Sequence, residues 1–193
     1  MRVLPSCTRL LSASAKGSVE ISSREYPLFP IAAVAVTTRL VGSEPGRYLL
    51  VQRAKEPGKG MWSLPGGGIS SGEATMAAAS RELLEETGLG PSEVKFAPRP
   101  FTSTDAIYKD EENITRFHYV ISQTFAFAAR GSEVRAIAGD DAAAVGWFSI
   151  EEMKQMSHPG VVPVMIGVVC QAEKLVNSGF LMDKDFASTA GTN

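Results

Sequence analysis

A run of glycines before a helix that ends in acidic residues is the feature that most constrains this chain of 193 residues. The run is Pro65-Gly66-Gly67-Gly68, and a helix is predicted over residues 73–87. Gly88 stands where helices favour a left-handed residue, so the helix is expected to end at Thr87. Its final turns then carry three acids, Glu82, Glu85 and Glu86.

These three carboxylates are unfavourable for an isolated helix. Glu82 lies three and four residues before Glu85 and Glu86, so all share one face, and each like-charged pair costs about 0.2–0.5 kcal/mol. The negative end of the helix dipole adds about 0.3–1 kcal/mol for each charge before screening. A divalent cation would remove this conflict, and oxygen ligands without His or Cys favour Mg²⁺ or Mn²⁺ over zinc. The alternative is a solvated acidic helix end; the glycine run argues against it, because it lets backbone approach a ligand closely.

The segment from Gly67 to Leu89 resembles a complete Nudix box. The pattern is Gly, five residues, Glu, seven residues, and then Arg-Glu-apolar-any-Glu-Glu-any-Gly-apolar. Every fixed position is filled, by Gly67, Glu73, Arg81, Glu82, Leu83, Glu85, Glu86, Gly88 and Leu89. From average residue usage, a chance match has odds on the order of one in ten million. The flanking residues 53–62 and 139–141 are similar to ADP-ribose pyrophosphatase-like members of the Nudix hydrolase family.

The resemblance implies a fold of the α/β class, the Nudix α/β/α sandwich with a mixed β-sheet. The residues alone also predict strands interspersed with helices, which is typical of a mixed sheet covered on both faces. Strands are expected at residues 31–37, 47–53, 62–64, 94–101, 116–127 and 143–148, and further helices at 149–156 and 161–177. Ser149 and Glu152 have capping-box spacing, and residues 105–113 are expected to form a polar, acidic loop.

The resemblance also implies a role for each acid of the box. Glu82, Glu85 and Glu86 would hold the metal ions together with the carbonyl of Gly66, and Glu85 or Glu86 would take a proton from the attacking water. Arg81 and Glu73 would form an ion pair that aims the catalytic turn. Glu73 has a second interpretation, because Ser70 and Glu73 also have the spacing of a capping box.

Many family members supply another acid from a loop before the last strand. Asp141, with its neighbour Asp140, is the candidate for this acid. Glu111 and Glu112 are alternatives, although they also suit a solvated loop.

Several groups are candidates for binding the substrate. Arg53 and Lys59 flank the loop ahead of the box and could hold phosphates, as could the backbone of Gly67. Arg116 and His118 are further candidates, although a lone His on a strand is more often an ordinary surface or core residue.

The net charge of −2 gives no footprint for a long nucleic acid, so a small nucleotide-like substrate is expected. The family implies hydrolysis of a nucleoside diphosphate linked to another moiety, with an ADP-ribose-like compound favoured. The alternatives are a house-cleaning nucleoside triphosphate pyrophosphatase and a non-catalytic nucleotide-binding module, which would be expected to lose metal carboxylates. Homodimers are common in the family, so a homodimer is a candidate state.

The chain is expected to form one domain over residues 26–178, followed by a tail at 179–193. Residues 1–25 suit either a flexible tail or a transit peptide, because the first nineteen residues carry Arg2, Arg9 and Lys16 and no acid. The location therefore stays open between mitochondrial and cytoplasmic. Residues 161–170 are the most apolar run but are too short to span a bilayer, so no membrane association is expected.

Overall fold

Strand β1 (Ile31–Leu40) is the central strand of a mixed sheet and is buried along most of its length. The computed structural model describes residues 29–139, 142–156, 160–162 and 164–182. The other elements are β2 (Tyr48–Arg53), β3 (Trp62–Ser63), β4 (Gly66–Gly68), α1 (Thr75–Thr87), β5 (Val94–Phe96), β6 (Thr102–Lys109), β7 (Thr115–Ala128), the 3-10 helix η1 (Ser132–Val134), β8 (Ala142–Phe148), α2 (Ile150–Gln155) and α3 (Met165–Asn177). In these described segments, no helix has both the length and the apolar character needed to cross a membrane.

Both edges of β1 are paired. Along one edge it runs parallel to β7 from its first residue to its last. Along the other edge, β2 meets it at Arg39 and β4 pairs with it from Ala33 to Ala35. The sheet continues through β3 and β8 on β2, and through β5 and β6 on β7. Strand β4 therefore lies beside the N-terminal half of β1, where β2 is absent.

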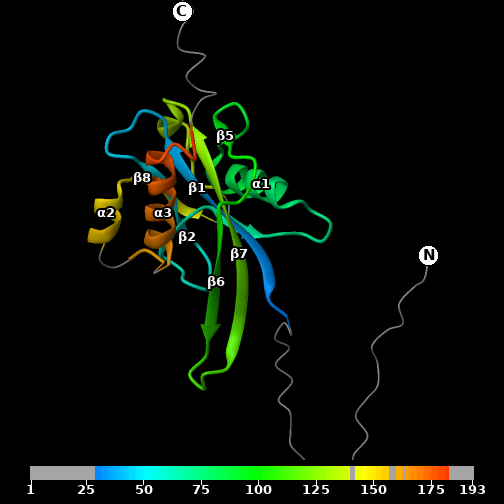
Figure 1. Cartoon of the computed structure of the whole chain (residues 1–193). Coiled ribbons are helices and arrows are strands. Elements are labelled where there is room, and N and C mark those ends of the chain that lie inside the picture. The colour runs from blue at the N-terminus through cyan, green and yellow to red at the C-terminus, as the bar shows by residue number, and fades with distance from the viewer. Residues whose placement is uncertain (1–28, 140–141, 157–159, 163, 183–193) are drawn as a thin grey trace, which may run out of the picture.

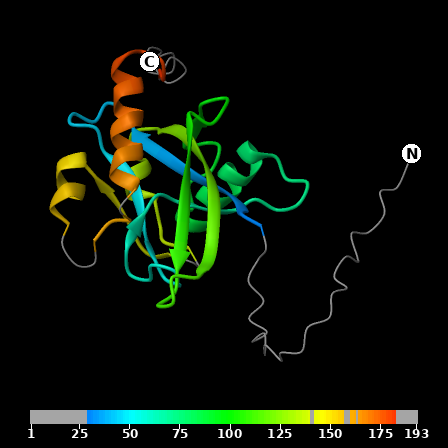
Figure 2. The same ribbon diagram turned by 60° about the horizontal axis from the view of Figure 1, so that its bottom comes forward.

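Helices cover both faces of this sheet because the side chains of its strands alternate between the faces. On one face, Leu50 and Phe125 belong to a core cluster with Val169 of α3. On the other face, Leu49 belongs to a cluster with Leu83 of α1. Figures 1 and 2 show α1 and α3 on opposite sides of the strands. The predicted α/β/α sandwich with a mixed sheet is confirmed.

A buried polar cluster attaches α3 to the sheet. The hydroxyl of Tyr48 donates to the carboxylate of Glu173, and Arg39 Nε donates to the same oxygen at 3.1 Å. Tyr48 is fully buried and Arg39 is 6% exposed. Burial raises the pKa of the Tyr48 hydroxyl, and the hydrogen bond to Glu173 raises it further. The three groups satisfy one another, so the polar atoms do not oppose packing of the helix.

The expectation of a loop at residues 105–113 is wrong. Strand β6 occupies most of this segment and pairs antiparallel with β7, from Thr102 opposite Gln123 to Lys109 opposite Thr115. Its side chains alternate between exposed and partly buried positions. A strand with one solvated face accepts polar residues at every second position, which is why its composition resembles that of a loop.

Two other elements are shorter than expected. Helix α3 begins at Met165 rather than at residue 161, because Val161 forms a parallel bridge with Trp62 and Val162 N–H donates to the Trp62 carbonyl at 2.9 Å. Val162 also precedes a proline, a position that disfavours helix. The strand expected at 94–101 ends at Phe96, since two prolines follow it.

The packed part of the chain continues beyond residue 178. Leu181 is 7% exposed and belongs to the core cluster on the α3 side. Its backbone N–H donates to the carbonyl of Leu175 at 3.1 Å, which folds the segment back on the end of α3. The N-terminal segment 1–25, predicted as a tail or transit peptide, lies outside the described residues, as does the chain after residue 182.

Replacing Ser149 with Ala is expected to lower the free energy of unfolding by about 0.5–2 kcal/mol, because it removes the N-cap of α2. The predicted capping box is present: Ser149 Oγ accepts from the N–H of Glu152 at 3.2 Å, and the Glu152 carboxylate accepts from the N–H of Ser149 at 2.6 Å. Urea unfolding measures the change. Ser71→Ala, at an exposed turn position, is the control. Equal losses in the two variants would contradict the capping role.

Candidate active site

Helix α1 begins at Thr75 rather than at residue 73. Its N-cap is Ala74, which offers no side-chain hydrogen bond. The carboxylate of Glu73 instead accepts from the backbone N–H of Ser70 at 3.0 Å and closes the turn before the helix. The spacing of these two residues therefore stabilises a turn and does not cap α1. At the other end, Gly88 has φ of 71°, so the predicted left-handed C-terminal residue is confirmed.

Arg81 connects α1 with the segments on both sides of it. Its Nε and Nη2 donate to the two carboxylate oxygens of Glu73 at 2.8 and 2.9 Å. Nη2 also donates to the carbonyl of Gly68 at 3.0 Å. Nη1 donates to Glu82 at 2.6 Å and to Glu85 at 3.2 Å. One guanidinium thus joins the turn before the helix, strand β4 and the acidic face of α1.

This guanidinium also fixes the charge of Glu73. Hydrogen bonds from Arg81, assisted by the N–H of Ser70, lower the pKa of Glu73 to about 2. The carboxylates of Glu73 and Glu82 in turn raise the pKa of Arg81 above its ordinary value. A depressed carboxyl pKa stabilises the fold above the ordinary value of 4.5, and this contribution is lost as the pH falls toward 2. The ion pair therefore keeps both charges at neutral pH.

The three acids of the helix end already have protein donors. Glu82 and Glu85 contact the same nitrogen of Arg81, and Glu86 Oε2 accepts from the backbone N–H of Gly66 at 3.0 Å. Within the described residues, no three or more His, Cys, Asp or Glu side chains are arranged as a preformed metal site. Metal binding at these acids would therefore require them to turn from their present partners.

The donor set nevertheless fits a hard divalent cation. All three side chains offer carboxylate oxygens, which Mg²⁺ prefers. Glu82 and Glu85 already share one cationic group, so their charges converge on a common position. Gly67 leaves room beside them, because a Cβ at this residue would lie 2.6 Å from the carboxylate of Glu82. Any side chain at residue 67 would displace that carboxylate.

Strand β4 stands between these carboxylates and a cavity. Gly67 faces Glu82 on the α1 side of the sheet. All three glycines of β4 line a cavity of about 250 Å³ on the α3 side, which Met165 of α3 also lines. The three glycines thus bring the acidic helix end and the cavity within one strand of each other.

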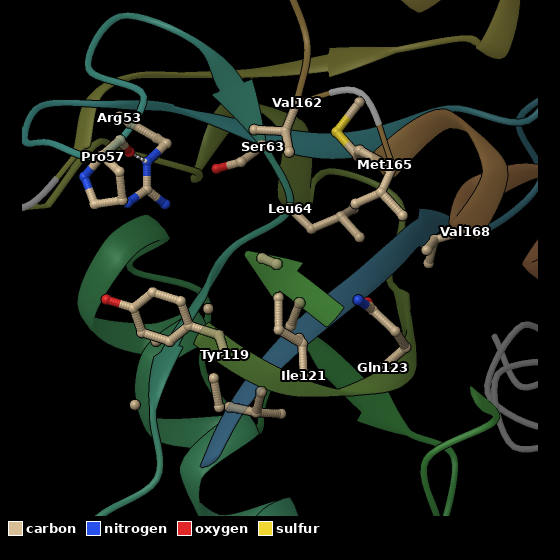
Figure 3. A pocket seen from close by; sticks show the side chains of 18 of the residues that line it. Arg53, Pro57, Ser63, Leu64, Tyr119, Ile121, Gln123, Val162, Met165 and Val168 are labelled. Atoms are coloured by element: carbon tan, nitrogen blue, oxygen red, sulfur yellow. Dashed lines mark hydrogen bonds between the residues drawn. The ribbon is translucent and has the colours of Figure 1, made fainter. Parts of the chain in front are cut away.

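The cavity exists because the sheet beneath it carries small side chains. Ala33 and Ala35 of β1 lie opposite Gly68 and Gly66 in the register of β4, so this part of the sheet presents methyl groups or none. The walls include Arg53, Pro57, Ser63, Leu64, Tyr119, Ile121, Gln123, Val162, Met165 and Val168. Figure 3 shows Arg53 and Gln123 at opposite ends of this pocket.

Sequence reasoning did not identify Tyr119 and Gln123 as site residues. They stand with Ile121 at alternate positions of β7, opposite Ile31, Ala33 and Ala35 of β1. The alternation of β7 was visible in the sequence, and the pairing of its residues with alanines was not. The signal that could have identified them is the pair of small residues, Ala33 and Ala35, on one face of the buried strand β1.

One of the two predicted phosphate-binding cations lines the cavity. Arg53 Nε donates to the carbonyl of Pro57 at 2.7 Å, which holds its side chain along the rim. Lys59 is exposed in the loop that follows and does not line the cavity.

The other candidates lie elsewhere or outside the described residues. Arg116 pairs with Asp110 and His118 with Asp105, each at 2.8 Å, within the β6–β7 hairpin. Glu111 and Glu112 are exposed at the tip of this hairpin, which projects away from α1 in Figure 1. The structure therefore does not bring these residues to the acidic helix end. Asp140 and Asp141 lie outside the described residues.

The segment before β8 packs on the C-terminal end of α1. Ile137 N–H donates to the carbonyl of Thr87 at 2.9 Å, and Gly139 N–H donates to the carbonyl of Glu86 at 3.0 Å. A Cβ at Gly139 would lie 1.8 Å from the carbonyl oxygen of Glu85. This segment thus satisfies carbonyls that the helix end leaves without intrahelical partners.

Comparisons with known proteins show the family of this chain. The NUDIX domain family profile matches residues 31–165. The ADP-ribose pyrophosphatase of Methanocaldococcus jannaschii is 34% identical over 134 residues, which cover 69% of this chain and 72% of that protein.

Two solved structures share the fold. A binary complex of the C. elegans Ap4A hydrolase has a TM-score of 0.61 and 14% identity, covering 77% of this chain and 98% of that one. The NUDIX domain of Shewanella oneidensis NrtR, complexed with ADP ribose, has a TM-score of 0.57 and 19% identity. The similarity covers 77% of this chain and 89% of that one.

The chain belongs to the NUDIX domain family. It is a Nudix hydrolase of the pyrophosphatase type, as predicted from the box. Hydrolases of this family generally use divalent metal ions.

Replacing Gly67 with Ala is expected to weaken the binding of Mn²⁺ by about 10–100-fold, the usual cost of disturbing groups that orient metal ligands. The added methyl group would collide with the Glu82 carboxylate. Titration calorimetry with Mn²⁺ measures the effect. Gly68→Ala is the matched control, because a Cβ there meets no atom within 4 Å. Equal Mn²⁺ affinities in the two variants would contradict the assignment of Glu82 as a metal ligand.

Proposed function

We propose that this chain hydrolyses the pyrophosphate bond of a nucleoside diphosphate linked to another moiety, with Mg²⁺ as its metal and an ADP-ribose-like compound as its substrate. The position of β4 carries the proposal, since Glu82 faces one side of this strand and the cavity opens on the other. Among the described strands β4 pairs with β1 alone, so its second edge is not covered by another strand. A nucleotide with its base in the cavity could lay its phosphates across that edge.

The sequence relative supports the substrate class. The Methanocaldococcus jannaschii protein is an ADP-ribose pyrophosphatase, and its similarity covers most of both chains. The cavity of about 250 Å³ is smaller than the roughly 300–1,000 Å³ typical of sites for drug-sized ligands. It would therefore take one part of such a substrate and leave the diphosphate outside.

The acidic helix end would do the chemical work. Glu82, Glu85 and Glu86, with the carbonyl of Gly66, would hold Mg²⁺, which when bound polarises phosphate oxygens and acidifies water. Glu85 or Glu86 accepts the proton of the attacking water. Glu85 reaches solvent, with 57% of its side chain exposed, and Glu86 is held by the backbone of β4.

Other residues position the reacting groups. Arg81, held by Glu73, fixes the last two turns of α1 relative to β4 and is a positioning residue. Arg53 lies at the rim of the cavity, where its charge would neutralise substrate phosphates. Lys59 follows in the loop after β2. The backbone of Gly67 would allow the diphosphate to approach because no side chain intervenes.

A nucleoside triphosphate pyrophosphatase is the second candidate. A putative 8-oxo-dGTP diphosphatase of Bacillus subtilis is 47% identical over 49 residues, although this covers only 25% of this chain and 31% of that protein. So short a match supports the shared chemistry more than the substrate. A non-catalytic module is disfavoured because all three acids of the helix end are retained.

Replacing Glu86 with Gln is expected to reduce Mg²⁺-dependent turnover by about 10²-fold or more, whether Glu86 is the base or a ligand. The amide oxygen can still accept from the N–H of Gly66, so the fold should be retained. Glu111→Gln, at the tip of the β6–β7 hairpin, is the control. Turnover near that of the wild type in Glu86→Gln would reject this role.

The substrate itself is tested by screening purified protein with Mg²⁺ or Mn²⁺. The panel contains ADP-ribose, NADH, dinucleoside polyphosphates, and ordinary and oxidised nucleoside triphosphates, with Glu86→Gln as the blank. We expect ADP-ribose to be cleaved to AMP and ribose 5-phosphate, identified by chromatography. Preferential release of pyrophosphate from a nucleoside triphosphate would favour the second candidate instead.

A further inference from the structure

Strand β6 lies at an edge of the sheet, and its outer edge is open among the described strands. It pairs with β7 along one side and with no other strand in the described part of the chain. The hairpin that it forms with β7 extends away from the helices in Figure 1. A strand at the edge of a sheet presents N–H and C=O groups that can pair with a strand of another molecule. The outer edge of β6 is therefore a candidate docking surface.

The exposed side chains of β6 carry opposite charges on either side of an apolar residue. Every second residue of the strand is exposed, and these residues are Ser103, Asp105, Ile107 and Lys109. Ile107 is 52% exposed. Asp105 precedes it by two residues and Lys109 follows it by two. Because the two charges have opposite signs and are equally distant from Ile107, two copies of this strand complement each other when they run antiparallel.

This complementarity selects one register. A two-fold axis normal to the sheet would set two β6 strands antiparallel, with their equivalent faces on the same side. With the axis at Ile107, the two Ile107 side chains face each other and Asp105 of each copy faces Lys109 of the partner subunit. An axis one residue further along the chain would set Asp105 against Glu111 of the partner subunit, which has the same charge. Opposite charges directly across two strands stabilise their pairing and like charges weaken it.

The other face of β6 suits the same register. Ala106 and Tyr108 alternate with the exposed residues and line the cavity. Tyr108 packs edge-on against Tyr119, with 6.3 Å between the ring centroids. With the axis at Ile107, each Tyr108 would lie opposite Ala106 of the partner subunit. A large ring therefore meets a methyl group rather than a second ring, and neither face of the strand opposes the pairing.

The two charged groups can take up partners in a second copy. Asp105 Oδ1 contacts His118 Nε2 at 2.8 Å, and Lys109 Nζ donates to Asn113 Oδ1 at 3.1 Å. These contacts leave capacity, because a carboxylate has a second oxygen and an ammonium group has three donors. The side chain of Asp105 is 61% exposed. Both charges are thus accessible from the open edge of the hairpin.

We propose that β6 is the interface of a homodimer, in which the β6 strands of two copies pair antiparallel about an axis at Ile107 and join the two sheets. The inference is independent of the proposed function, because it needs neither metal nor substrate. An interface built on one strand of eight residues belongs with weak, reversible associations rather than with the large interfaces of permanent dimers. The dimer therefore dissociates on dilution, which makes its dissociation constant measurable.

Charge reversal tests the register. Sedimentation velocity of the full chain over a concentration series should show a monomer–dimer equilibrium. Asp105→Lys and Lys109→Asp would each place like charges across the interface, and each should raise the dissociation constant of the dimer by about tenfold or more. The double variant Asp105→Lys/Lys109→Asp restores opposite charges at both positions, so its dissociation constant should return toward that of the wild type.

The double variant also separates this interface from an effect within one hairpin. It lacks the contact between Asp105 and His118, as Asp105→Lys does, so its recovery could come only from pairing between copies. Glu111→Lys is the matched control, because in this register residue 111 would face the uncharged Ser103 of the partner subunit. Its dissociation constant should stay near that of the wild type.

Three outcomes would overturn the proposal. The first is a monomer at every concentration. The second is a dimer whose dissociation constant does not respond to either single charge reversal. The third is a double variant that associates as weakly as the single variants. Circular dichroism of each variant confirms that a change in association does not reflect loss of the fold.

Discussion

The guanidinium of Arg81 is the interaction on which the arrangement of the site depends. It donates hydrogen bonds to both carboxylate oxygens of Glu73 and to the carbonyl of Gly68, and it contacts Glu82 and Glu85. Without this cation, the acids of α1 would repel one another at the negative end of the helix dipole. With it, the same acids are tied to a turn and a strand on either side. The electrostatic repulsion among these acids, which would destabilise an isolated helix, is therefore offset within the protein. A metal ion would compete with Arg81 for the carboxylates of Glu82 and Glu85.

The alternation of side chains along β1 and β4 lets one small region serve two purposes. Residues that face α1 build a tight core, in which Val34 and Val36 are buried. On the α3 face, Ala33 and Ala35 of β1 lie opposite Gly68 and Gly66 of β4, so the sheet leaves a cavity there. A Cβ at Gly66 would lie 2.2 Å from the carbonyl oxygen of Val34, and a Cβ at Gly67 would lie 2.6 Å from the carboxylate of Glu82. Register in this short strand thus determines both the shape of the cavity and the room available to a carboxylate.

Much of this could be predicted from sequence, because strong local patterns carried it. The box determined the family, Gly88 determined the end of α1, and the Ser149 capping box was visible from spacing alone. The strand β6 was missed because its polar residues belong to a hairpin with a solvated face, and only the partner strand reveals it. The cavity was missed for a related reason. Alanine and glycine give no periodic signal, and a space between elements exists only once distant strands such as β1 and β7 are paired.

The attachment of Ile137 and Gly139 to the end of α1 links the acidic helix end to the rest of the sheet. These residues donate to the carbonyls of Thr87 and Glu86, and β8 begins three residues after Gly139. Strand β8 pairs along the whole of β2, which ends at Arg53 on the rim of the cavity. Backbone hydrogen bonds and strand pairing therefore join the C-terminal end of α1, which bears the carboxylates, to Arg53 at the rim of the cavity. Backbone pairing within the sheet therefore sets the spacing between the acids of α1 and this cation, whichever rotamers their side chains adopt.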